Sequence, residues 1–247
     1  MKINRLLIVL TSVVVLSSCV KTPIENQDED IRFSVLGDSY STFEGYVTPE
    51  TNDVWYCLPP DNYIDVTSVE EMWWHQVAVE KGWTLEQNNS FSGSLISNFL
   101  DFNGGVYYSP HSFLRRMDDI GDPNVIFVFG GTNDVWDEAP LGDFVYGNWT
   151  EEQLCTFRPA LAYMFEHLKA TYPKAKVYFM LDKHLGEGQD IHQEHCESFR
   201  SSVHEIARHC GITCIDLEDI HKSWNHPDKK GQASIARQVL EALELDL

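Results

Sequence analysis

The amino-acid sequence predicts an α/β fold in which helices cover both faces of a parallel sheet, giving a three-layer α/β/α sandwich. Two observations predict this fold class. Short apolar runs, rich in β-branched and aromatic residues, alternate along the chain with longer segments of helical periodicity. The runs are also almost continuously apolar, which is typical of strands that are covered on both faces.

The expected elements follow this alternation in chain order. Strands are expected at 33–36, 84–88, 125–129, 177–181 and 212–217, of which the second is the weakest. Helices are expected at 69–81, 111–119, 151–171, 190–209 and 229–244. Thr150 and Gln153 have the spacing of a capping box at the start of the third helix, and Gly211 suits the end of the fourth.

Two segments between these elements, 42–68 and 134–149, are longer than most loops, and loops of this length are often functional. They carry Trp55, Trp136 and Trp149, whose indole rings are candidates for stacking on a sugar. The same rings could instead fold back onto the body of the protein.

The start of the chain has the features of an export signal. Lys2 and Arg5 precede an apolar run at 6–16, and small residues then lead to Cys19. This pattern is typical of a secretory signal peptide over 1–18. Its ending resembles the bacterial lipobox, in which the cysteine after the cleavage site carries the lipid.

The next segment, 19–30, is acidic and lacks an apolar pattern, so it is expected to form a tether after the lipidated cysteine. A single domain is expected to fill 31–247. The predicted location is therefore the bacterial cell envelope, facing the periplasm or on the cell surface, with the lipid anchor at Cys19 as the membrane contact.

Composition excludes several classes of protein. The chain of 247 residues has 18 Lys and Arg against 38 Asp and Glu, a formal net charge of −20. Such a charge repels nucleic acid, so no nucleic-acid partner is expected, and it argues against a basic patch for anionic lipids. The hydrophobic content of 43% is enough for a sizeable core and excludes general disorder.

Five cysteines follow Cys19, and an odd number cannot all pair within one molecule. Cys57 with Cys155, or Cys210 with Cys214, could form a disulfide. Free, buried thiols are the favoured interpretation.

Three residues of the fourth expected helix, His192, His195 and Cys196, share one face with a spacing that could hold zinc. The sequence shows no fourth ligand, and residues of this kind more often form a polar helix face. No metal is therefore expected.

Four short blocks lie just outside an expected strand or helix. They are GDSYS at 37–41, NNSFSGS at 88–94, GGTND at 130–134 and HPDKKG at 226–231. Any one of them could be only a turn, but together and in this order they are specific. Because ligands of such sheets bind outside the carboxyl ends of the strands, the blocks are candidates for one site.

With these blocks the sequence resembles the SGNH (GDSL) hydrolase family over roughly residues 31–240. The resemblance implies a flavodoxin-like α/β/α sandwich and the hydrolysis of acyl esters through an acyl-serine, with no metal or organic cofactor. Ser39 matches the family's nucleophile and His226 its general base. Gly93 through its backbone N–H and Asn133 through its side-chain amide match the oxyanion hole.

These residue types suit that chemistry. A serine hydroxyl is a poor nucleophile until a base removes its proton, and histidine titrates near neutrality. Donors aimed at the oxyanion of a tetrahedral intermediate are worth about 3 kcal/mol each in the transition state.

One position departs from the family's pattern, which usually has an aspartate three residues before the histidine. This chain has Ser223 there. Ser223 or a backbone carbonyl could orient the imidazole, which would leave a Ser–His dyad, or the enzyme could be impaired. An acid elsewhere could also substitute, and the candidates are Asp216, Glu218, Asp219 and Asp228. His221, with Glu218 three residues before it, is a weaker rival for the base because the following Pro and Gly are missing.

The predicted function is an O-acetyl carbohydrate esterase, because aromatic and acidic loops suit a neutral glycan better than an anionic one. A short-chain carboxylesterase or lipase-like enzyme is the alternative within the same chemistry. A catalytically weak, glycan-binding accessory lipoprotein is the alternative from a different class, motivated by the missing aspartate. The expected partner is an acylated glycan or another small ester.

Overall fold

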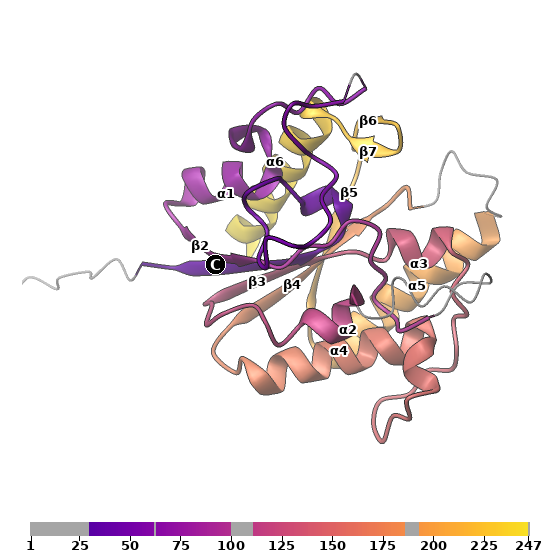
Figure 1. The fold of residues 1–247 in the computed structure, drawn as a ribbon. Helices are drawn as coiled ribbons and strands as arrows, with labels where there is room; N and C mark the ends of the chain where they lie inside the picture. Colours follow the sequence, from indigo (N-terminus) through magenta and orange to yellow (C-terminus); the bar gives the residue numbers. More distant parts are fainter. Residues whose placement is uncertain (1–29, 62, 100–110, 186–192, 247) are drawn as a thin grey trace, which may run out of the picture.

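The computed structural model describes residues 30–61, 63–99, 111–185 and 193–246, and its centre is a five-stranded sheet (Figure 1). The strands are β1 (Arg32–Gly37), β2 (Thr84–Asn88), β3 (Val125–Phe129), β4 (Lys176–Asp182) and β5 (Thr213–Leu217). They pair in the order β2-β1-β3-β4-β5, and every neighbouring pair is parallel. The predicted parallel sheet is confirmed, and the strand order is flavodoxin-like.

Helices lie on both faces of this sheet, so the predicted three-layer α/β/α sandwich is also confirmed. The described helices are α1 (Trp73–Lys81), α2 (Phe113–Arg116), α3 (Thr132–Trp136), α4 (Phe157–Thr171), α5 (Gln193–Cys210) and α6 (Lys229–Leu245). Figure 1 shows α1 and α6 on one face and α2, α4 and α5 on the other.

Strand side chains alternate between two cores, one on each face of the sheet. On β3, Ile126 and Val128 belong to the core beneath α4, whereas Phe127 and Phe129 pack edge-on against Trp73 of α1. Both sets are buried. Burial on both faces explains why the strand sequences are continuously apolar instead of alternating.

The third expected helix is broken near its start. Residues Gln153–Cys155 form a short 3₁₀ turn, and α4 begins only at Phe157. The reciprocal bonds of the expected capping box do form, because Thr150 N–H donates to the Gln153 side chain and Gln153 N–H donates to the Thr150 hydroxyl. They lie at the short turn and not at the start of α4. The break follows from Pro159, which fits the first turn of a helix but would clash inside a helix over 151–171.

Other element boundaries also differ from the expectation. The segment 69–81 divides into a 3₁₀ turn, Val69–Glu71, and α1, because Met72 is extended and Trp73 N–H donates to the Gln232 side chain. The segment 111–119 yields only the single turn of α2, and α3 occupies the start of the expected loop 134–149.

Neither disulfide considered from the sequence forms, because no disulfide joins the cysteines within the described ranges: Cys57, Cys155, Cys196, Cys210 and Cys214. Over the same ranges, no helix is long and apolar enough to cross a bilayer. Cys19 and the expected signal peptide lie outside the described residues.

Gly231 marks a close approach between α6 and the chain before it. A Cβ at this position would lie 2.1 Å from the carbonyl oxygen of His221, which is a backbone atom. Because that carbonyl also accepts a hydrogen bond from Asp228 N–H at 3.2 Å, it has little freedom to move.

We therefore expect Gly231→Ala to lower the free energy of unfolding by roughly 1–3 kcal/mol, measured by urea denaturation. Gly147→Ala is the matched control, because a Cβ there would meet nothing within 4 Å, and it should not lower that free energy. Equal stability of the two variants would contradict the close approach.

Candidate active site

The four sequence blocks converge at the carboxyl ends of β1 and β3. The strand order reverses between these two neighbours, which is where ligands bind in open parallel sheets. Ser39 follows β1 directly and Asn133 lies in α3, directly after β3. His226 comes from a small hairpin formed by β6 (Lys222–Ser223) and β7 (His226–Pro227).

The turn that carries Ser39 is held by its neighbours. The Asp38 side chain caps it by accepting the Tyr40 backbone N–H at 3.0 Å. Trp73 and Trp74 donate their indole N–H groups to the hydroxyl and the carbonyl of Ser41, at 3.2 and 3.0 Å. Burial raises the pKa of the Asp38 carboxyl to about 7.

Ser39 and His226 form the central contact of the site. The Ser39 Oγ lies 2.9 Å from Nε2 of His226, and the two residues are only 5% and 8% exposed. Nδ1 lies 3.0 Å from the Trp224 carbonyl oxygen. A carbonyl can only accept, so Nδ1 carries the proton and Nε2 of the neutral ring is free to accept one from the serine hydroxyl.

The electrostatic surroundings of His226 favour its neutral form. Burial lowers the pKa of its imidazole to about 4, the Trp224 carbonyl partly offsets this, and the charge of Lys222 lowers it further. A base with such a pKa stays deprotonated at neutral pH and can take a proton.

The hairpin turn aims the Trp224 carbonyl at the imidazole. Trp224 and Asn225 both have positive φ, at 51° and 64°, which is the signature of a two-residue type I′ turn. A tryptophan rarely adopts this conformation. The Tyr40 hydroxyl donates to the Asn225 carbonyl at 2.8 Å, which ties the turn to the segment that carries Ser39.

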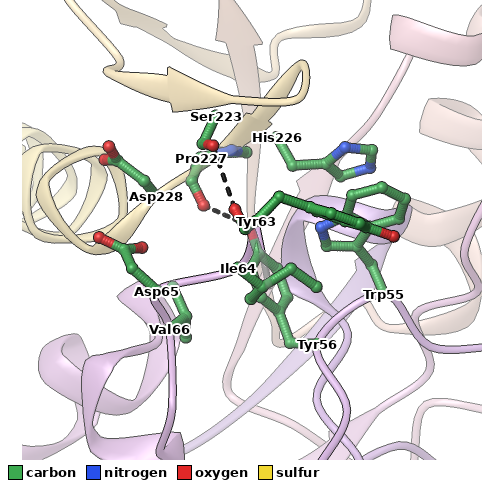
Figure 2. A pocket seen from close by; sticks show the side chains of 10 residues that line it. All are labelled: Trp55, Tyr56, Tyr63, Ile64, Asp65, Val66, Ser223, His226, Pro227 and Asp228. Carbon is green, nitrogen blue, oxygen red and sulfur yellow. Dashed lines mark hydrogen bonds between the residues drawn. The ribbon is translucent and has the colours of Figure 1, made fainter. Parts of the chain in front are cut away.

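Ser223 stands where the family usually has an aspartate. Among the described residues, no hydrogen bond joins Ser223 to the imidazole of His226. Its hydroxyl donates to the Tyr63 carbonyl at 3.1 Å, and Figure 2 shows the imidazole of His226 extending away from this bond.

The candidate carboxylates are engaged elsewhere. Asp216 pairs with His204, Glu218 pairs with Lys183, and Asp228 pairs with His221 and caps α6. Asp219 is exposed, and within the described ranges no hydrogen bond joins it to His226. The imidazole is therefore oriented by a backbone carbonyl, one of the alternatives that the sequence left open.

The expected oxyanion groups lie in the loops after β2 and β3. The Asn133 side-chain amide donates one N–H to the Ser94 carbonyl at 2.9 Å, which leaves its second N–H for a ligand. Gly93 has a φ of 79°, which glycine tolerates best. The buried Asp134 carboxylate accepts the N–H groups of Ile96 and Ser97 at 2.7 and 3.1 Å, so it fixes the loop that follows Gly93.

Sequence reasoning missed Arg116, a buried cation beneath these loops. Its guanidinium donates to the Gly37 carbonyl at 3.2 Å, to the Ser94 hydroxyl at 2.8 Å and to the Asn89 carbonyl. Burial lowers its pKa to about 9. The sequence signal is an arginine among the apolar residues of 113–117, but it does not separate Arg116 from its neighbour Arg115.

The three tryptophans expected to bind substrate occupy different places. The Trp55 indole stacks on the imidazole of His226, with ring centroids 3.5 Å apart, and Figure 2 shows the two rings together. Trp136 approaches the same imidazole edge-on at 6.5 Å. Trp149 packs instead on Tyr163 of α4, at 5.3 Å.

Two further aromatic residues that sequence reasoning did not select line this region. Tyr63 lies against Trp55 at 6.1 Å and against Trp224 at 5.1 Å between ring centroids. Trp224 is 69% exposed at the tip of the hairpin. Neither position stands out in the sequence, because their proximity to His226 depends on how loop 42–68 and the hairpin pack together.

One set of described residues, His204, Cys214 and Asp216, has ligand atoms within 4.8 Å of one another. These residues lie on α5 and β5, outside the Ser39–His226 pair, and His204 already contacts Asp216 at 3.2 Å. Of the zinc-spaced set considered from the sequence, His192 lies outside the described residues.

Comparisons with known proteins place this geometry in a family. The model of the GDSL-like lipase/acylhydrolase family matches residues 31–243. A structure from Bacteroides ovatus, of a protein named a GDSL-like lipase, is 44% identical with a TM-score of 0.79, and the match covers 87% of this chain and 98% of that one. A protein of the same name from Bacteroides uniformis is 41% identical with a TM-score of 0.79, over 87% of this chain and 96% of its own.

A more distant structural neighbour is a family two carbohydrate esterase from Clostridium thermocellum. It is 15% identical with a TM-score of 0.55, over 88% of this chain and 64% of its own, and this similarity shows the fold alone. A search of curated protein sequences finds no match. The family match over nearly the whole described domain and the two close structures show that this chain belongs to the GDSL-like lipase/acylhydrolase (SGNH hydrolase) family and is a serine ester hydrolase.

Proposed function

We propose that Ser39 is the nucleophile and His226 the general base of ester hydrolysis, and that the substrate is an O-acetylated carbohydrate. The roles of Ser39 and His226 rest on the 2.9 Å contact between Ser39 Oγ and Nε2 of the His226 ring, which is neutral and protonated on Nδ1. Both atoms are already at the distance that proton transfer needs.

The reaction follows from this geometry. Nε2 takes the hydroxyl proton as Oγ bonds to the acyl carbon, and the carbonyl electron pair moves onto oxygen. Collapse of this tetrahedral intermediate expels the alcohol, which takes the proton from Nε2. A water molecule then attacks the acyl-Ser39 in the same way and releases the acid and the free enzyme.

The oxyanion is held by three donors: the backbone N–H groups of Ser39 and Gly93 and the free N–H of the Asn133 amide. Asn133 is only 8% exposed and is fixed by its bond to the Ser94 carbonyl. A preorganised donor of this kind contributes about 3 kcal/mol in the transition state because little reorganisation is needed.

The aromatic rim supports a carbohydrate as the substrate. Trp224 and Tyr63 are exposed side by side next to the base, and Trp55 and Trp136 complete the aromatic lining around His226. Aromatic faces of this kind suit the apolar face of a neutral sugar ring. Two of the distant structural neighbours are named carbohydrate esterases, which agrees with this substrate class although their similarity shows only the fold.

We expect Trp224→Asn to reduce kcat/KM for an acetylated oligosaccharide about five-fold more than for p-nitrophenyl acetate, because one stacking contact of about 1 kcal/mol is lost. Asparagine tolerates the left-handed backbone of residue 224, so the carbonyl that orients His226 keeps its place. Steady-state kinetics on both substrates measure the ratio.

Ser39→Ala is the control and should abolish turnover of both substrates. Preference of the wild-type enzyme for long-chain esters over acetylated oligosaccharides would support a lipase-like enzyme and contradict the carbohydrate proposal. Oligosaccharide binding without turnover by the wild type would point to an accessory binding protein.

The proposed dyad predicts an unusual pH dependence. The base form of His226 is the neutral ring, so kcat/KM for a small ester should rise with pH through about 4 and stay level above it. Ser223 lies directly opposite His226 in the hairpin, so Ser223→Asp would add a negative charge one cross-strand position from the imidazole. That charge raises the imidazole pKa, so the acid limb should move upward by about one to two pH units.

Ser223→Ala is the matched variant, and it should leave the acid limb in place because the hydroxyl contacts the Tyr63 carbonyl. An acid limb of the wild type near pH 7 would contradict the buried, carbonyl-bound imidazole. So would a loss of activity in Ser223→Ala as large as that in His226→Ala.

We also propose that the protein is exported and anchored by a lipid on Cys19, on the strength of the basic, apolar and small-residue sequence before it. Cys19→Ser should then release the protein from the membrane fraction of a bacterial host. Detergent phase partitioning of the cell fractions measures this release. Cys57→Ser is the control and should remain in the membrane. Membrane retention of Cys19→Ser would contradict the anchor.

A further inference from the structure

The Trp55 indole lies flat against the imidazole of His226. The ring centroids are 3.5 Å apart and the planes differ by 7°, so the whole face of the imidazole is covered (Figure 2). Tyr63 supports Trp55 from the side at 6.1 Å. Within the part of the chain that the structure describes, this is the closest aromatic contact of the imidazole, since Tyr40 and Trp136 approach it edge-on at 5.4 and 6.5 Å.

Trp55 and the next residue are tied by hydrogen bonds to the segments that carry Ser39 and His226. Trp55 N–H donates to the Thr42 hydroxyl at 2.9 Å, and that hydroxyl donates to the Ser39 carbonyl at 3.0 Å. The hydroxyl of the next residue, Tyr56, donates to the Pro227 carbonyl. The indole is therefore placed by bonds to the segment of the nucleophile and to the segment of the base.

Among the described residues, no carboxylate is paired with the imidazole of His226. Lys222 is the charge that acts on the imidazole, and it lowers the pKa although it is paired with Asp182. Asp65 and Asp228 line the small pocket beside His226, but Asp65 accepts the Lys229 N–H and Asp228 is bound to His221 and the α6 N-terminus.

Catalysis requires that positive form. The imidazole becomes an imidazolium when it takes the proton of Ser39, and again when it takes the proton of the attacking water. A cation over the face of an indole is attracted by the electron density of the ring, and the attraction is stronger where water is excluded. The neutral imidazole of the resting enzyme gains much less from this contact. The indole therefore favours the transition state over the ground state.

We propose that Trp55 is a positioning residue that acts through His226: its indole holds the imidazole toward Ser39 and stabilises the imidazolium by a cation–π contact, in place of the missing aspartate. This inference rests on the proposed roles of Ser39 and His226. It assigns Trp55 to the chemical step, whereas stacking on a sugar would assign it to substrate binding.

The test places tryptophan with zero, one, two and four ring fluorines at position 55 alone, by stop-codon suppression. Fluorine withdraws electron density from the ring face with little change of shape, so it weakens a cation–π contact while keeping the packing. Turnover of p-nitrophenyl acetate is measured at pH 8, where the imidazole is neutral in every variant. This substrate has no sugar to stack.

We expect log kcat to fall steadily along the series, reaching a loss of about 30-fold with four fluorines, while KM changes little. Trp55→Phe should lose less than Trp55→Leu, because a phenyl ring retains part of the attraction. The same fluorinated series at Trp83, which packs on Phe33 at 6.4 Å, is the matched control and should leave kcat unchanged.

A constant kcat along the series at position 55, together with a loss in Trp55→Leu, would show a purely steric role and overturn the proposal. A rise in KM with unchanged kcat would assign Trp55 to substrate binding and overturn it as well. Ser39→Ala and His226→Ala are measured alongside: if either retains turnover, the proposed dyad itself is wrong.

Discussion

A hydrogen bond of 2.9 Å between Ser39 Oγ and His226 Nε2 joins two segments that are 187 residues apart in the chain. The order of the sheet makes this contact feasible, because β1 and β3 end side by side at the reversal point. The hairpin between β5 and α6 lies against the turn that follows β1. Side-chain bonds then fix the distance. Tyr40 donates to the Asn225 carbonyl and Tyr56 to the Pro227 carbonyl, so the segments around Ser39 hold the hairpin that carries His226.

The electrostatic arrangement of the site differs from that of a serine–histidine–aspartate triad. A backbone carbonyl orients the imidazole but offers only a partial negative charge, so burial dominates and lowers the pKa of His226. The consequence is an imidazole that is uncharged at neutral pH and whose protonated form is costly. Any group that stabilises the imidazolium without a full charge, such as the indole face of Trp55, gains importance in this setting.

Much of the fold and part of the site could be predicted from the sequence. Continuous apolar runs predicted the five strands because both faces of the sheet are buried. The four blocks predicted that Ser39 and His226 lie at one edge of the sheet, where they form a hydrogen bond. The broken start of α4 was missed because the helical periodicity over 151–171 hid the effect of Pro159.

The remaining features of the site could not be predicted, because they depend on a backbone carbonyl and on side chains that belong to no recognisable sequence motif. The partner of the imidazole is a backbone carbonyl, and it points at Nδ1 only because Trp224 and Asn225 adopt positive φ. Trp55 reaches the site from a long loop and Arg116 from a short helix. The sequence pattern of neither segment indicates that its side chain points toward the site. Such contacts follow from tertiary packing, so they require the structure.

The catalytic proposal depends on an imidazole of His226 that is neutral, protonated on Nδ1 and bound to a carbonyl instead of a carboxylate. Nitrogen-15 NMR of histidine-labelled protein, with the His226 signals assigned by comparison with His226→Ala, tests it directly. We expect a protonated Nδ1 and a bare Nε2 that persist down to about pH 4. An imidazole that is protonated at both nitrogens at pH 6–7, or one with the proton on Nε2, would contradict it.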